Sequence, residues 1–127
     1  MQVYVPLNTP HTYGQTKPFA LALAQLLERR HPKLVVSEMK KSLRAGKVFV
    51  DWSQNDEHKT TVCAYSLRAR ERPTVSTPLR WEEVEAAAAS GEPEQLAFTS
   101  DEVLARVAEH GDLFAPVEAL QQELPAL

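Results

Sequence analysis

The chain has 127 residues, one cysteine and a formal net charge of −3 at pH 7, and 24% of its residues are charged. This size and balance are those of one ordinary globular domain. A single cysteine excludes an internal disulfide and a multi-cysteine metal site, and no apolar run approaches the roughly 20 residues that cross a bilayer. The amino-terminal residues lack a signal-peptide pattern, so we expect a cytoplasmic protein.

Basic and acidic residues are unevenly distributed along the chain. Residues 29–72 hold 11 Lys or Arg and 5 Asp or Glu, whereas residues 73–127 hold 2 and 11. A basic middle beside an acidic flank is typical of a polyanion-binding surface. The same pattern would arise if the acidic residues of 73–127 neutralised the basic charges of 29–72 across a packed interface. Charge alone leaves both interpretations open.

The first third of the chain predicts a strand and a long helix. Residues 2–7 are rich in β-formers, and residues 8–10 have turn composition. An amphipathic helix follows and ends before Pro32, with either Thr12 or Thr16 as its N-cap. A second, brief helix is predicted from Ser37 through Leu43.

The middle of the chain predicts a hairpin followed by a basic segment. Residues 47–52 and 59–65 read as two strands joined by a polar turn, and Cys63 is expected to be a small buried hydrophobe. Arginines occupy every second position in the segment that follows. If this segment is extended, these side chains point the same way, which suits a phosphate chain: Arg68, Arg70 and Arg72.

The last third predicts three helices, over residues 81–89, 100–108 and 118–124, the first two ended by Gly91 and Gly111. The predicted fold class is therefore α+β, with a small, mostly antiparallel sheet flanked by helices. We expect one domain over residues 1–127. Its sheet-and-helix core spans about residues 1–75, and a helical tail spans residues 76–127.

Asp51 interrupts the apolar run Val48-Phe49-Val50. Because an unpaired buried charge is costly, this carboxylate is expected either to pair with a cation or to hold a metal ion. A salt bridge with Arg44 or Lys47 is the ordinary alternative, since ion pairs also explain an acidic residue among basic ones.

Several motifs occur in a fixed order around Asp51. They are K-S-L-R-A-G-K-V-F-V-D-W-S-Q-N at 41–55, K-T-T-V at 59–62, Y-S-L-R-A-R at 65–70, R-P-T-V at 72–75, W-E-E-V at 81–84 and G-D-L-F-A-P at 111–116. Together they resemble the C-terminal part of the polymerase domain of bacterial DNA ligase D, in the archaeo-eukaryotic primase superfamily. The resemblance covers nearly the whole chain. It implies a nucleotidyltransferase that adds nucleotides at DNA ends in non-homologous end joining.

The resemblance also implies roles for particular residues. Asp51 matches the third carboxylate of the family's two-metal site, and is thus the expected catalytic and metal-binding residue. The expected nucleotide-binding residues are Arg44, Gln54, Arg68 and Arg70. The implied cofactor is a divalent metal, Mn or Mg. The implied partners are DNA ends and nucleoside triphosphates, with an N-terminal polymerase subunit, a ligase or Ku, and no membrane. The implied location is the cytoplasm, in association with the nucleoid.

The chain departs from the family in one large respect. Family members carry a D-x-D pair, a histidine and a Ser/Gly/Lys-rich stretch before the segment that residues 1–7 match, and this sequence has none of them. We therefore expect a truncated polymerase-like chain that is inactive in isolation. The alternative is a non-catalytic remnant or a split subunit that only binds a nucleotide or nucleic acid. Apolar strands at residues 3–5 and 48–50 further predict a homodimer, or a larger assembly, unless a separate N-terminal subunit covers them.

Overall fold

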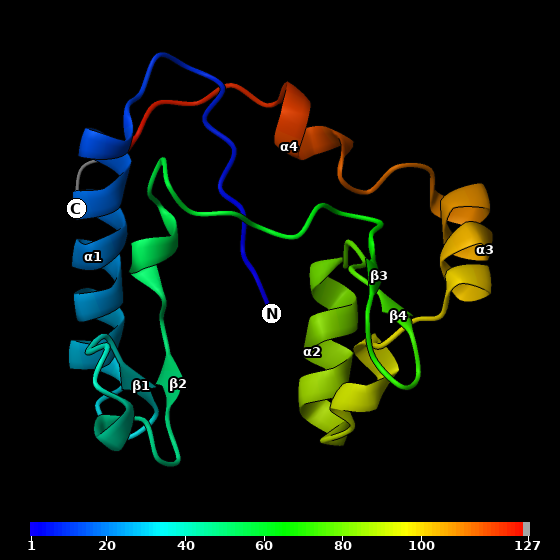
Figure 1. Cartoon of the computed structure of the whole chain (residues 1–127), viewed down its shortest axis with the longest axis horizontal. Coiled ribbons are helices and arrows are strands. Elements are labelled where there is room, and N and C mark those ends of the chain that lie inside the picture. Colours follow the sequence, from blue (N-terminus) through cyan, green and yellow to red (C-terminus); the bar gives the residue numbers. More distant parts are fainter. Residues whose placement is uncertain (126–127) are drawn as a thin grey trace. The chain divides into compact units, whose positions relative to one another are not determined.

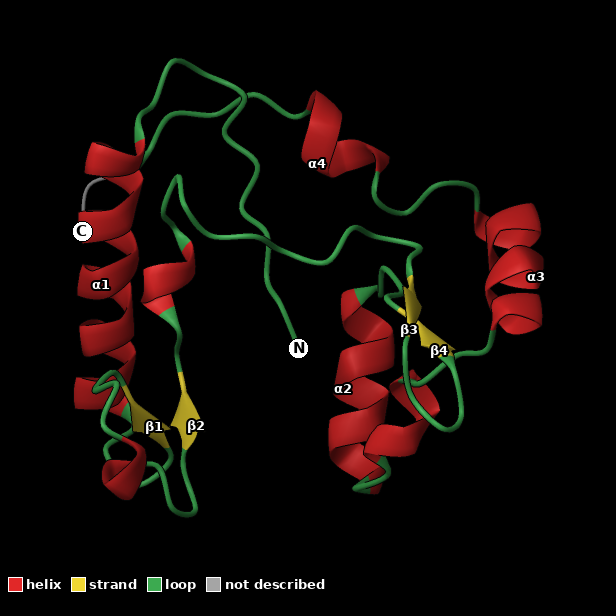
Figure 2. Cartoon of the chain, in the orientation of Figure 1, coloured by secondary structure: helices red, strands yellow, loops and turns green. Residues whose placement is uncertain are grey.

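The computed structural model describes residues 1–125, which form two compact units (Figure 1). The α1 unit consists of residues 7–61 with residues 121–125. The α2–α4 unit consists of residues 1–6 with residues 62–120. Helices dominate both units, and each unit has one two-stranded sheet (Figure 2). The predicted α+β class is confirmed, with one sheet parallel and the other antiparallel.

Helix α1 (Tyr13–Arg30) begins at Thr12, one of the two predicted caps. The Thr12 backbone N donates to Gln15 Oε1 at 2.9 Å, and this capping box satisfies a donor that has no partner inside the helix. The helix ends where His31 N donates to the carbonyl of Leu27 at 2.8 Å. Ala24 is completely buried, and its small side chain lets neighbouring segments approach the helix closely.

Strands β1 (Val35–Val36) and β2 (Val48–Phe49) pair in parallel, with Val35 opposite Val48. The predicted hairpin is therefore wrong, since residues 59–65 contain no strand. The physical reason is burial. Pairing of β2 with β1 buries Val35 and Val36, which are 8% and 2% exposed, in the core of the α1 unit. The polar segment K-T-T-V has less apolar surface to bury.

Ser37 joins α1 to the parallel strands. Its backbone N and its hydroxyl donate to Glu28 Oε2, at 3.2 and 2.5 Å, and its carbonyl accepts from Trp52 Nε1 at 3.1 Å. These hydrogen bonds from Ser37 lower the pKa of Glu28. Ser37 thus does not cap the predicted helix at residues 37–43. Only a 3₁₀ turn, η1 (Lys41–Leu43), forms there.

The α2–α4 unit contains an antiparallel hairpin and three helices. Strands β3 (Leu67–Arg68) and β4 (Thr74–Val75) pair with Arg68 opposite Thr74. Helices α2 (Trp81–Ser90) and α3 (Ser100–His110) end at glycines with φ of 72°, as predicted.

Two predicted elements at the ends of the chain are wrong. Residues 1–8 form no strand, because strand formers need a neighbouring strand and both described sheets are built from other segments. The last helix, α4 (Ala115–Ala119), lies earlier than predicted. Pro116 favours a first helical turn there, and further along Gln122 N donates to the carbonyl of Leu7 at 2.8 Å instead of continuing a helix.

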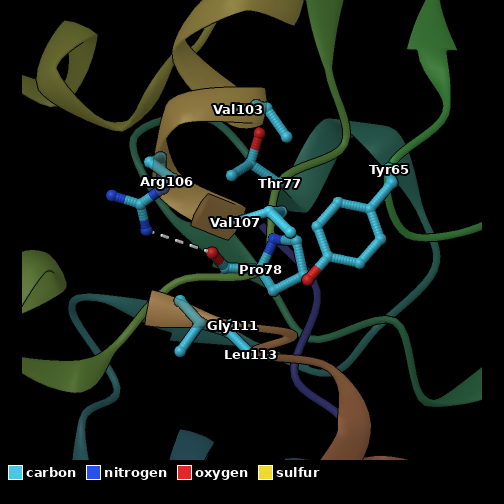
Figure 3. A pocket seen from close by; sticks show the side chains of 8 residues that line it. All are labelled: Tyr65, Thr77, Pro78, Val103, Arg106, Val107, Gly111 and Leu113. Carbon is cyan, nitrogen blue, oxygen red and sulfur yellow. Dashed lines mark hydrogen bonds between the residues drawn. The ribbon is translucent and has the colours of Figure 1, made fainter. Parts of the chain in front are cut away.

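An ion pair connects α2 and α3. Arg106 Nη1 and Nη2 donate to the two carboxylate oxygens of Glu83 at 2.5 and 2.9 Å, and these side chains are only 14% and 18% exposed. The guanidinium carbon lies 4.3 Å from the centre of the Phe98 ring. Figure 3 shows Arg106 turned towards the carbonyl of Pro78, beside a small cavity of about 10 Å³.

Few side chains of the described residues are fully buried. The buried apolar residues are Ala24, Val35, Val36, Ala87 and Val103. Cys63 is exposed, so its predicted burial is wrong. Within residues 1–125, no helix combines the length and the apolar character that crossing a membrane requires.

Candidate nucleotide-binding site

Asp51 follows β2 and begins the 3₁₀ turn η2 (Trp52–Gln54). Its Oδ1 accepts from Ser53 N at 3.2 Å and from Ser53 Oγ at 2.5 Å, while Oδ2 lies 3.4 Å from Gln54 Nε2. The side chain is exposed. The structure thus brings two of the predicted site residues, Asp51 and Gln54, into contact. It presents an oriented carboxylate to solvent.

The ion-pair alternative for Asp51 is not found among the described residues. Arg44 instead places its guanidinium carbon 3.8 Å from the centre of the Phe49 ring and donates from Nη2 to the carbonyl of Met39. Lys47 Nζ donates to the carbonyl of Pro32 at 2.6 Å. Arg44 Nε is buried and has no hydrogen-bond partner, so this side chain keeps one unused donor.

The other two predicted arginines lie in the α2–α4 unit. Arg68 is at the end of β3, and Arg70 begins the bend that leads to β4. Both are exposed. Because residues 70–72 form this bend, the segment is not extended as far as Arg72, and the prediction of three aligned arginines is wrong.

Arg68 also lines a groove of about 510 Å³ within its own unit, which we call the apolar groove. The other lining residues are mostly apolar and include Tyr4, Leu79, Trp81, Val84 and Phe114. Tyr4 and Phe114 contact each other edge to face, with ring centres 5.3 Å apart. Trp81 is 65% exposed.

Tyr65 is a feature that the sequence did not indicate. It precedes β3 and has φ of 64°, a left-handed conformation that is rare for an aromatic residue. Its hydroxyl donates to Asp112 Oδ1 at 2.6 Å. Burial, followed by this hydrogen bond, raises the pKa of Tyr65. The backbone N of Tyr65 donates to the carbonyl of Ser76 at 2.7 Å, which connects this residue to the hairpin that carries Arg68.

The described residues do not make a metal site by themselves. Across residues 1–125, no three His, Cys, Asp or Glu side chains are grouped closely enough to share an ion. The nearest acidic residue in the sequence, Asp56, is already bonded to Lys17 Nζ, and this hydrogen bond lowers its pKa. Asp51 therefore offers one carboxylate, and further ligands would have to come from other residues.

Comparison with known proteins gives a consistent result. The sequence model of the family described as "LigD, primase-polymerase domain" matches residues 1–114. The chain is 48% identical over 119 residues to the "Multifunctional non-homologous end joining protein LigD" of Mycolicibacterium smegmatis. It is 33% identical over 112 residues to the "Bifunctional non-homologous end joining protein LigD" of Bacillus subtilis.

These matches cover most of the chain but only part of each relative. They include 94% and 87% of this chain, against 15% of the mycobacterial protein and 18% of the Bacillus protein. A solved structure described as "Polymerase Domain from Mycobacterium tuberculosis Ligase D in complex with DNA" matches with a TM-score of 0.80 and 45% identity. That match covers 92% of this chain and 39% of the other.

Proposed function

Because the chain belongs to the LigD primase-polymerase domain family, we propose that it forms the part of a nucleotidyltransferase site that holds the nucleotide's phosphates. In this proposal the site acts in DNA repair by non-homologous end joining and adds nucleotides at DNA ends. Asp51 is its catalytic and metal-binding carboxylate. Arg44, Gln54, Arg68 and Arg70 contact the nucleotide.

The observation that carries the proposal is the state of Asp51. Its carboxylate is exposed, oriented by Ser53 and Gln54, and has no basic partner among the described residues. The basic residues predicted for a structural ion pair, Arg44 and Lys47, contact backbone carbonyls instead. A carboxylate held in place without a cation is available for a ligand. Divalent metals, Mn or Mg, are the cofactors expected in this family.

A nucleotide-binding measurement tests the proposal. The Arg68→Ala and Arg70→Ala variants are each expected to weaken binding of a nucleoside triphosphate by about 1.5–3 kcal/mol, the range for a hydrogen bond to a charged group. Isothermal titration calorimetry on the 127-residue polypeptide measures this change directly. Arg44→Ala should weaken binding too, but this variant also loses the packing of Arg44 on Phe49.

Arg72→Ala is the matched control. Arg72 is exposed in the same hairpin, but the proposal gives it no contact with the nucleotide. The affinity of the Arg72→Ala variant for the nucleoside triphosphate should stay close to that of the unmodified chain. Thermal unfolding should confirm that every variant is folded. Equal affinity in the Arg68, Arg70 and Arg72 variants would remove the proposed site.

A second candidate is a non-catalytic remnant or a split subunit that binds nucleotide or nucleic acid. The absence of a three-ligand group within residues 1–125 favours it for this polypeptide alone. In a split arrangement, a separate N-terminal subunit supplies the other carboxylates. The ligase and Ku remain the proposed further partners, in the cytoplasm at the nucleoid.

We also propose that a second copy of the chain covers exposed apolar surface. Val3 and Val48 are 63% and 58% exposed, and Trp81 at the apolar groove is 65% exposed. Exposed apolar residues in each of the two units favour association. Light scattering at micromolar concentration is expected to give at least the mass of a dimer. A clean monomer with no partner chain present would contradict this prediction.

A further inference from the structure

Two sequence motifs that lie far apart in the chain meet through one hydrogen bond. Tyr65 begins the motif Y-S-L-R-A-R, and Asp112 is the second residue of G-D-L-F-A-P. The Tyr65 hydroxyl donates to Asp112 Oδ1 at 2.6 Å, across 47 positions of the chain. Both residues belong to the α2–α4 unit. The proposed nucleotide site uses the arginines of the first motif and no residue of the second.

Tyr65 is held through its backbone and its side chain. Its backbone N donates to the carbonyl of Ser76 at 2.7 Å, and Ser76 N donates to the carbonyl of Ser66 at 2.8 Å, so these bonds extend the β3–β4 pairing to the base of the hairpin. Its side chain lines the small cavity of Figure 3 together with Val103 and Val107 of α3. An aromatic residue rarely adopts φ of 64°, and such a conformation persists only where surrounding contacts hold it.

Asp112 is held in place on the other side of this contact. It lies in the segment between α3 and α4, and its Oδ1 also accepts from Phe114 N at 2.8 Å. The hydrogen bond from Tyr65, followed by the one from Phe114 N, lowers the pKa of Asp112. Asp112 is therefore a carboxylate at neutral pH, and a hydrogen bond to a charged acceptor is stronger than one to a neutral acceptor.

The hairpin that begins at Tyr65 needs such an attachment. Its ladder pairs two residues of each strand, with Arg68 opposite Thr74, and an isolated two-stranded hairpin is only marginally stable in water. Val75 N donates to the carbonyl of Phe98 at 2.9 Å, which attaches β4 to the rest of the unit. The Tyr65 hydroxyl attaches the chain just before β3. Because Arg68 is exposed and lies three residues further on, the position of its guanidinium depends on how β3 is held.

We propose that Tyr65 is a positioning residue: through its hydrogen bond to Asp112 it holds β3 in the orientation in which Arg68 reaches a bound triphosphate. This inference rests on the proposed nucleotide site and adds to it a residue that does not itself contact the nucleotide. Hydrogen bonds from a guanidinium to phosphate weaken when their geometry is lost. Arg68 on a loosened strand therefore contributes less to binding.

Hydrogen exchange and calorimetry on the 127-residue chain test this inference together. In Tyr65→Phe, the amides of residues 66–76 are expected to exchange about tenfold faster, because one hydrogen bond to a charged group is lost. The amides of α2 should exchange as before. With ATP as the probe, the Kd should rise about three- to tenfold. Asp112→Ala should have the same effects, and the double variant should be no worse than Asp112→Ala, because both substitutions remove one contact.

Asp112→Asn and Tyr4→Phe are the matched controls. An amide oxygen still accepts from a hydroxyl, so Asp112→Asn should recover most of the affinity that Asp112→Ala loses. A role for the charge of Asp112 alone would instead make these two variants equal. Tyr4→Phe removes the other phenol hydroxyl of the same unit and should change the affinity for ATP less than about twofold.

Unchanged exchange of the hairpin amides in Tyr65→Phe would overturn the inference, because the contact would then not hold β3. Faster exchange with unchanged affinity for ATP would overturn it as well, since the contact would then serve stability alone. Failure of the proposed nucleotide site gives a different result, in which Arg68→Ala also binds ATP as the unmodified chain does. Weaker binding in Arg68→Ala beside unchanged binding in Tyr65→Phe removes this inference alone.

Discussion

The 127-residue polypeptide alone is expected to add no nucleotide to a primed DNA template. Metal-assisted phosphoryl transfer needs its ions held by several fixed ligands. Residues 1–125 provide Asp51 but no group of three potential ligands. Gel analysis of primer extension with Mn²⁺ and nucleoside triphosphates measures this directly.

Asp51→Ala provides the control for that assay. Residual extension that is the same in both chains indicates a contaminating polymerase and leaves the expectation intact. Extension by the unmodified chain that disappears in Asp51→Ala would contradict it. Such a result would also exclude the non-catalytic alternative.

Replacing Arg106 by Ala is expected to be the most destabilising single change in the α2–α4 unit. It leaves the Glu83 carboxylate, which is 18% exposed, without its two charged donors. Breaking a buried pair costs about 3–5 kcal/mol, and the partial exposure reduces this to about 2–3 kcal/mol. Urea unfolding followed by Trp81 fluorescence, in a Trp52→Phe background, reports on this unit.

Arg80→Ala is the matched control, because Arg80 also approaches Glu83. Its Nε lies 4.0 Å from Glu83 Oε2 and its side chain is 48% exposed. Such a surface pair contributes less than about 1 kcal/mol. If Arg106→Ala and Arg80→Ala lower the free energy of unfolding by similar amounts, the Arg106–Glu83 pair contributes no more than an exposed surface pair.

The same ion pair predicts a dependence of stability on pH. The hydrogen bond from Arg106 lowers the pKa of Glu83 from its usual 4.5 to about 2. A carboxyl group whose pKa is lower in the folded chain stabilises the fold above the unfolded pKa. This stabilisation is therefore complete above about pH 4.5 and is lost as the pH falls towards 2. In Arg106→Ala, this component of the pH dependence should become much smaller, because only the contacts with Arg80 still lower the pKa of Glu83.

The sequence predicted those elements whose signals are local. Gly91 and Gly111 end α2 and α3 because a left-handed residue is a local requirement, and Thr12 caps α1 through a residue three positions away. The β pairing could not be predicted in this way. Val35 and Val36 form too short an apolar run to identify as the partner of β2, and their pairing depends on burial that only the fold provides.

The sequence indicated candidate site residues, but it could not indicate their contacts. The motif around Asp51 resembles that of a known family, and the periodicity of helices and strands alone would not have identified these residues. The sequence could not indicate that Arg44 packs on Phe49 or that Tyr65 has a positive φ, because both depend on neighbouring segments. Cys63 was predicted buried as part of a strand, and it is exposed because that strand does not form.

The hydrogen bonds between residues 7–9 and Gln122 have a practical consequence for truncation. Gln122 N donates to the carbonyl of Leu7, and Thr9 Oγ1 donates to the carbonyl of Gln122 at 2.9 Å. These contacts belong to the α1 unit, which contains residues from both ends of the chain. The chain passes from one unit to the other three times, after residues 6, 61 and 120. No single cut releases either unit whole. An expression fragment that stops at residue 120 would lose Gln122 and its hydrogen bonds to residues 7–9, which precede α1. A fragment cut at residue 61 would leave both units incomplete.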